Sequence, residues 1–196
     1  MKISKAILSL GILLSIQLGF SQENADNDRS SVGLKAGYNS SSVRTDSGSE
    51  ANHKSGFYIG FFGESFVGKS ISIQPELMYS QQGYEVETSS YTYTQKLNYI
   101  NLPIMIKVYP VEGFYLELGP QIGYAISHKE EFDSSLINSS REFEPNSFTW
   151  GLNGGIGFVT KGGFGINARY HYGLGEVIND SNYFNNVLQI GVALHF

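Results

Sequence analysis

Apolar and polar residues alternate along most of the chain from Val32 onward, which is the period of a β-strand with two different faces. No segment in this region has a convincing helical period. Eight alternating runs can be counted, at residues 32–39, 56–64, 71–80, 99–108, 114–126, 150–158, 164–174 and 187–196. The pattern therefore predicts an all-β fold of eight antiparallel strands.

The connections between these runs alternate between long and short. Long connections rich in Ser, Asn, Asp, Glu and Thr are expected at residues 40–54, 82–96, 127–146 and 175–185, and short ones at 65–69, 109–112 and 160–163. Short periplasmic turns that alternate with long outside loops are typical of an up-and-down transmembrane β-barrel. An even number of strands would place both chain termini on the periplasmic side.

Alternation alone does not say which face of the sheet points inward. A soluble lipocalin-type barrel would place the apolar face inside, whereas an outer-membrane barrel places it against lipid. Glycine favours the second arrangement, because twelve of the 23 glycines fall on the polar face. Inside a narrow lumen, glycine leaves room for large inward residues such as Tyr58, Tyr99 and Arg169.

The polar face also carries balanced charges. Its three cations and three carboxylates are Lys35, Lys107, Arg169, Glu64, Glu76 and Glu117. Unpaired charges in a closed lumen would be costly, and equal numbers permit pairing. The sequence therefore predicts a charge network of these six residues in the lumen.

Aromatic residues gather near the expected strand ends, as in the interfacial girdles of membrane barrels. They are Tyr38, Phe57, Tyr79, Tyr109, Phe114, Trp150, Phe164, Tyr172, Phe184 and Phe196. Pro75 and Pro103 fall inside strand runs, although a closed barrel has no edge strand to host them. Bulges at these prolines, or strand boundaries that differ from the expected ones, are both open explanations.

The N-terminus has the pattern of a secretory signal peptide. Lys2 and Lys5 precede an uncharged apolar stretch at residues 6–20, and Gly19 and Ser21 stand at the −3 and −1 positions of a cleavage site. An uncleaved membrane anchor is the alternative. We expect a signal peptide at residues 1–21, a flexible segment at 22–30 and a barrel domain at 31–196, exported to the outer membrane.

Composition narrows the function classes further. The net charge of −5 and the pI near 5.3 argue against a nucleic-acid-binding surface. The absence of Cys excludes disulfides, thiolate metal sites, a Cys nucleophile and a lipoprotein anchor.

Catalytic and metal-binding chemistry finds little support in the sequence. No two of the four histidines, His53, His128, His171 and His195, have metal-ligand spacing. The acids near His128, which are Glu130, Glu131, Asp133 and Glu142, could hold an oxygen-ligated cation, but a solvated loop is the favoured interpretation. A catalytic rim would need Asp46, Glu50 and His53 to converge with His128 and Asp133. We expect no enzyme activity, no cofactor and no metal.

Several stretches resemble the PorT-like outer-membrane β-barrel family. They are residues 74–83 (QPELMYSQQG), residues 99–107 (YINLPIMIK), Gly119-Pro120, residues 168–170, residues 173–174 and the terminal Phe196. Asn101 departs from the family, in which this position is more often acidic. The resemblance implies an eight-stranded outer-membrane barrel without catalytic residues, and its namesake is tied to secretion and gliding-related export. Phe196 also looks like the C-terminal signal that the barrel-assembly machinery reads.

Together these features predict an integral outer-membrane barrel with a side-chain-filled lumen and a structural or interaction role. It could be an accessory of envelope assembly or protein secretion. The alternatives are a surface adhesin or receptor that acts through its long loops, and a narrow pore. The expected partners are outer-membrane lipid, the barrel-assembly machinery and an envelope or secretion protein, but no nucleic acid.

Overall fold

The computed structural model describes residues 30–45, 52–88, 91–134, 138–142, 148–176 and 183–196. Residues Ser31–Phe196 form one compact unit. The expected signal peptide, and the segment 22–30 apart from Ser30, lie outside the described residues, so both remain predictions. Within the described residues, no helix is long and apolar enough to cross a membrane.

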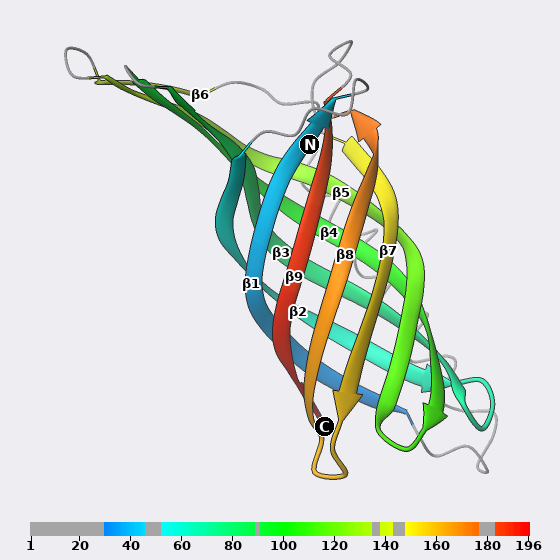
Figure 1. The fold of residues 1–196 in the computed structure, drawn as a ribbon. Coiled ribbons are helices and arrows are strands. Elements are labelled where there is room, and N and C mark those ends of the chain that lie inside the picture. The colour runs from blue at the N-terminus through cyan, green and yellow to red at the C-terminus, as the bar shows by residue number, and fades with distance from the viewer. Residues whose placement is uncertain (1–29, 46–51, 89–90, 135–137, 143–147, 177–182) are drawn as a thin grey trace, which may run out of the picture. The chain divides into compact units, whose positions relative to one another are not determined.

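Among the described residues, eight strands form a closed antiparallel barrel (Figure 1). They are β1 (Ser31–Thr45), β2 (Asn52–Phe66), β3 (Ile71–Thr88), β4 (Tyr91–Val111), β5 (Phe114–Ser134), β7 (Phe148–Val159), β8 (Phe164–Glu176) and β9 (Tyr183–His195). Pairing of β1 with β9 closes the ring. A short additional strand, β6 (Asn138–Glu142), pairs with β5 outside the ring. The predicted eight-stranded antiparallel barrel is confirmed.

The apolar face of the barrel points outward. The side chains of Ile104, Leu118 and Ile190, on three different strands, are 53%, 63% and 55% exposed. Inward positions hold buried polar residues, and Lys107 and Arg169 are each 1% exposed. Apolar side chains on the outside of the ring suit contact with lipid. The lipocalin-type alternative, in which these side chains would fill the centre, does not hold.

Glycines make room for the aromatic rings that point inward. A Cβ atom added at Gly191 would lie 2.2 Å from the Tyr58 hydroxyl oxygen, and one added at Gly37 would lie 2.7 Å from the same ring. A Cβ atom at Gly157 would lie 2.3 Å from Tyr115. These contacts agree with the expectation that glycine relieves crowding in a lumen only wide enough for side chains.

Most residues expected in two of the long loops belong to strands, so that prediction is wrong. β3 and β4 remain paired up to Thr88 and Tyr91, and β5 continues to Ser134 between β4 and β6. These paired segments form a sheet, which we call the extension (residues 84–88, 91–96, 128–134 and 138–142), at the upper left of Figure 1. Its Thr, Tyr and Val residues favour strands. Parts of the expected loops 40–54 and 175–185 also belong to strands.

Pro75 and Pro103 lie within continuous strands without a register shift. The β2–β3 pairing skips Pro75 and the β3–β4 pairing skips Pro103, and the register is the same on either side of each gap. On its other side, Pro75 pairs with Ile104 and Pro103 pairs with Gln121. Because proline has no N–H group, it cannot donate to the ladder. The barrel therefore accommodates both prolines through local gaps in pairing rather than through bulges.

Candidate functional site

The six charged residues expected in the lumen all lie inside the barrel, in two groups. The central cluster comprises Lys35, Glu76, Glu117 and Arg169, and the mouth cluster is built around Glu64 and Lys107, near the barrel end that carries the C-terminus. Every one of these residues is at most 4% exposed. Charges buried this deeply need partners and further hydrogen bonds.

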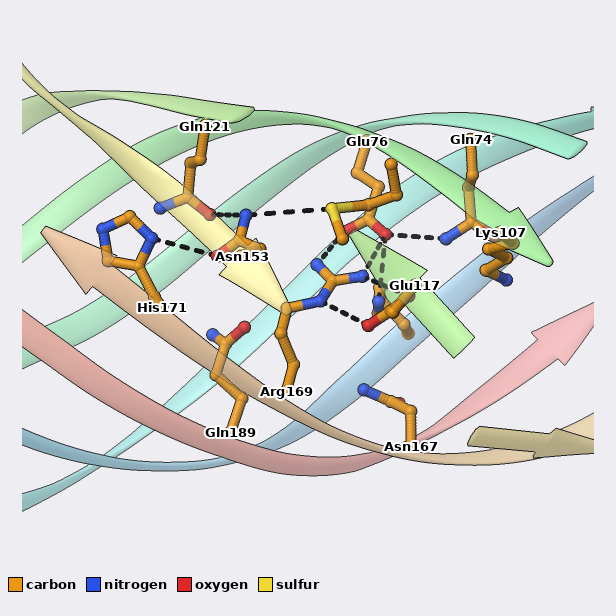
Figure 2. Close-up of polar contacts among 12 residues, drawn as sticks. Gln74, Glu76, Lys107, Glu117, Gln121, Asn153, Asn167, Arg169, His171 and Gln189 are labelled. Carbon is orange, nitrogen blue, oxygen red and sulfur yellow. Dashed lines mark hydrogen bonds and ion pairs between the residues drawn. The ribbon is translucent and has the colours of Figure 1, made fainter. Parts of the chain in front are cut away.

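Arg169 organises the central cluster by contacting two carboxylates at once (Figure 2). Its Nε and Nη2 atoms donate to the two oxygens of Glu117 at 2.7 and 2.9 Å. Its Nη1 and Nη2 atoms donate to the two oxygens of Glu76, both at 2.8 Å. Such two-point contacts are the strongest geometry that a guanidinium group makes with a carboxylate. Lys35 Nζ and Gln74 Nε2 also donate to Glu76 Oε1, at 3.1 and 2.6 Å.

The contact between Arg169 and Glu76 spans the lumen. Arg169 lies on β8 and Glu76 on β3, and these strands are four positions apart in either direction around the ring. Inside the same lumen, Asn153 Nδ2 on β7 donates to Met105 Sδ on β4, two positions away around the ring, at 3.8 Å. The Arg169–Glu76 contact therefore connects strands that lie on opposite sides of the ring.

The mouth cluster surrounds the Glu64 carboxylate. Lys107 Nζ lies 3.3 Å from Oε2, while the hydroxyl groups of Tyr109 and Ser72 donate to Oε1 at 2.6 and 2.5 Å. The Lys107 ammonium group also lies 4.1 Å from the centre of the Tyr115 ring. Tyr109 was expected in an aromatic girdle, and its half-buried side chain instead completes this cluster.

Ser31, His195 and Glu64 come together at the same mouth, but not in a catalytic arrangement. Ser31 Oγ lies 3.2 Å from His195 Nδ1, and Glu64 Oε2 lies 3.7 Å from the same nitrogen. A nucleophile and an orienting acid would have to use different ring nitrogens for the histidine to relay a proton. This geometry therefore favours a structural role for all three side chains.

Neutral amides line the lumen beyond the central cluster, on the side away from the C-terminus. Gln189 Nε2 donates to Asn39 Oδ1 at 3.0 Å, and Asn153 Nδ2 donates to Gln121 Oε1 at 3.1 Å. His171 Nδ1 lies 2.9 Å from Asn153 Oδ1, which places His171 in this layer rather than in the charge network (Figure 2). These residues fill the lumen with side-chain hydrogen bonds.

The sequence analysis did not identify two apolar residues whose side chains are buried inside the barrel. Val43 and Leu97 are 2% and 0% exposed, although the expected loops or loop borders contained them. Leu97 packs with Tyr99 and Ala125. The alternation of inward and outward positions could have identified both residues. Val43 is an even number of positions from the inward-facing Lys35, and Leu97 is two positions from the inward-facing Tyr99.

Most residues of the candidate cation site and of the candidate catalytic rim lie outside the part of the chain whose side chains the structure describes. Asp46 and Glu50 are outside the described residues, and the side chains of residues 128–134 and 138–142 are not described. In the part that is described, no group of three or more His, Asp or Glu side chains could hold a metal ion.

Comparisons with known proteins agree with this architecture. A family model described as outer membrane protein beta-barrel domain matches residues 20–179. The crystal structure of Neisserial surface protein A (NspA) is similar, with 15% sequence identity, coverage of 86% of this chain and 100% of that chain, and a TM-score of 0.58. Ail, the attachment invasion locus protein of Yersinia pestis, has 18% identity, coverage of 85% and 98%, and a TM-score of 0.53. No curated protein matches significantly.

Proposed function

The chain belongs to the outer-membrane β-barrel domain family, and from that premise we propose that it is a non-conducting interaction protein of the outer membrane. In this proposal the barrel is an anchor held in outer-membrane lipid. The extension presents a binding surface to a protein partner of the cell envelope.

The contact between Arg169 and Glu76 is the observation that carries the proposal. It joins opposite walls of the barrel with two hydrogen bonds of 2.8 Å. A pore would need a water-filled path through this level, and larger barrels than this one supply such paths. The narrow-pore alternative therefore has the weakest support.

The extension supports the interaction part of the proposal. Among the described residues, β6 pairs with β5 only, so one of its edges has no described strand partner. Exposed strand edges are templates on which an extended segment of another protein can add a strand. The pairing of β3 with β4 continues beyond the last β2 partner, Glu85, and so adds a second such edge.

Within this proposal, the protein is an accessory of envelope assembly or protein secretion. The resemblance to the PorT-like family supports this role. The terminal Phe196, as a signal for the barrel-assembly machinery, supports the same setting. We also propose that the protein has no catalytic activity, since Ser31 and Glu64 approach the same nitrogen of His195.

Two measurements test the proposal. Purified mature protein in planar bilayers should give no conductance steps, and discrete steps would overturn the non-conducting assignment. A photo-crosslinking amino acid at Thr92, in the extension, should capture a specific envelope protein in intact cells. The same probe at Ile104, on the lipid-facing wall, is the matched control. Equal capture at both positions, or none at Thr92, would contradict the interaction role.

A surface adhesin or receptor is the second candidate, and the same extension favours it, because it lies at the barrel end away from the C-terminus. Ail, which has a similar fold, is an attachment invasion locus protein. Deletion of residues 86–93, with a short Gly-Ser connection in their place, separates the two candidates. Loss of binding to host or abiotic surfaces, with unchanged envelope crosslinks from other extension positions, would favour the adhesin.

A further inference from the structure

Arg44 is a cation on the outward face of the barrel. It lies on β1 at an even-numbered position, as do Val32, Leu34 and Tyr38. The side chains of these three residues point outward and are 60%, 38% and 48% exposed. It pairs with Phe184 across the β1–β9 seam, near the barrel end away from the C-terminus. Figure 1 shows β1, β9 and β8 side by side there. Arg44 therefore lies beyond Tyr38, the last exposed apolar side chain of the described part of β1, toward the barrel end away from the C-terminus.

Two aromatic rings hold the guanidinium group in place. Its central carbon lies 4.4 Å from the centre of the Tyr172 ring and 4.9 Å from that of Phe184. Nη2 donates to the Gly173 carbonyl oxygen at 3.2 Å. Cation–π contacts of this kind fix the plane of an arginine without neutralising its charge.

Arg44 has no counter-charge among the side chains that the structure describes. Among the described residues, no carboxylate forms an ion pair with it, and its Nε atom is buried without a hydrogen-bond partner. In contrast, Arg169 in the lumen contacts two carboxylates. A cation fixed at a membrane interface without a counter-charge is suited to an anionic ligand.

A second unused polar group lies beside Arg44. Asn186 pairs with Tyr172 on one side and with Ser42 on the other, which places it on the same outward face. It is 3% exposed, and its Oδ1 atom has no hydrogen-bond partner. Oδ1 accepts hydrogen bonds but has almost no accessible surface, so a ligand hydroxyl would reach it only after neighbouring side chains move aside.

We propose that Arg44 and Asn186, framed by the rings of Tyr172 and Phe184, form a binding site for the phosphate-bearing, hydroxylated headgroup of an outer-leaflet lipid. The phosphate oxygens accept hydrogen bonds from the guanidinium group, and a headgroup hydroxyl donates to Asn186. The site fixes the depth and the rotation of the barrel in the bilayer. It is independent of the extension and of any protein partner.

The test measures lipid binding to the full mature chain folded in dodecyl maltoside. Native mass spectrometry would follow titration with phosphatidylglycerol, which has a phosphate and free hydroxyls, and with phosphatidylcholine, which has no free hydroxyl and is zwitterionic. Inorganic phosphate is a separate arm. The variants are Arg44→Gln, Arg44→Lys and Lys69→Gln, the last being a matched loss of charge at an exposed turn at the other end of the barrel.

We expect Arg44→Gln to weaken phosphatidylglycerol binding about tenfold, as for the loss of one charge-assisted hydrogen bond. Lys69→Gln should bind as the unaltered chain does, and Arg44→Lys should lie between the two. Unchanged binding by Arg44→Gln, or an equal loss in Lys69→Gln, would overturn the site. Binding of inorganic phosphate without preference for phosphatidylglycerol would overturn the lipid assignment. Equal urea midpoints for all variants would show that folding is not the cause.

Discussion

Arg169 and Glu76 lie on opposite strands of the ring, and their side chains nevertheless form a two-point ion pair with both N–O distances at 2.8 Å. The pair connects β8 with β3, which are not neighbours in the sheet. Backbone pairing fixes each strand only to its two neighbours, so this contact adds a constraint across the barrel. It joins two opposite sides of the wall through the lumen.

Replacing Arg169 with Leu should destabilise the barrel by about 3–5 kcal/mol, because Glu76 and Glu117 would lose their main buried partner. Urea titration of protein folded into detergent measures the change. Lys161→Leu is the control, since the Lys161–Glu112 pair has side chains 86% and 77% exposed and should contribute nothing measurable. Equal midpoints for the Arg169 variant and the unaltered chain would show that the central ion pairs do not stabilise the fold.

The balance of charge in the central cluster predicts that a second substitution can partly restore the stability lost by a first one. Glu76→Gln leaves Lys35 and Arg169 with only Glu117 as a counter-charge, so we expect a loss of about 3–5 kcal/mol. Adding Lys35→Met removes the excess cation and should recover about half of that loss, because the two sites are coupled. A double-mutant cycle of urea midpoints measures the coupling. Strictly additive effects would mean that water, not protein, compensates these charges.

Two glycines on one strand predict opposite results from the same substitution. Gly157 faces the Tyr115 ring, and an added Cβ atom would lie 2.3 Å from it. Gly157→Ala should therefore cost about 1–3 kcal/mol, and Tyr115→Leu in the same chain should recover part of it. Gly154 faces outward with its nearest neighbour at 3.9 Å, so Gly154→Ala should leave the free energy of unfolding unchanged or slightly raise it. Similar losses at both positions would contradict the crowded lumen.

The strand count and the inward face could be predicted because they depend on a local period. Lys35, Glu117 and Arg169 each stand at a polar position between apolar neighbours, and that alternation is visible in the sequence alone. The partition of the six charges into two clusters could not be predicted. It depends on the stagger of the strands around the ring, which brings residue 76 next to 169 and residue 64 next to 107.

The ends of the strands were the weaker part of the prediction. Polar segments such as residues 82–96 look like loops because nothing in their composition indicates burial. Pairing between neighbouring strands, however, continues wherever the backbone groups meet in register, and here it reaches Thr88 and Tyr91. The gaps beside Pro75 and Pro103 are likewise a tertiary result, because a strand with two neighbours can lose one hydrogen bond and still keep its register.

Phe196 offers a test that separates assembly from stability. Its side chain is 72% exposed, and its N–H donates to the Val32 carbonyl oxygen at 2.8 Å, so the backbone rather than the ring closes the seam. Phe164 is a matched control, because it is 46% exposed near the same end of the barrel. Phe196→Ser and Phe164→Ser should shift the urea midpoint of the purified protein by similar small amounts, since both rings contact lipid or detergent. In cells, Phe196→Ser should lower the amount of protein in the outer membrane several-fold, while Phe164→Ser should not. Equal amounts of both variants in the outer membrane would show that the assembly machinery does not depend on the terminal aromatic residue.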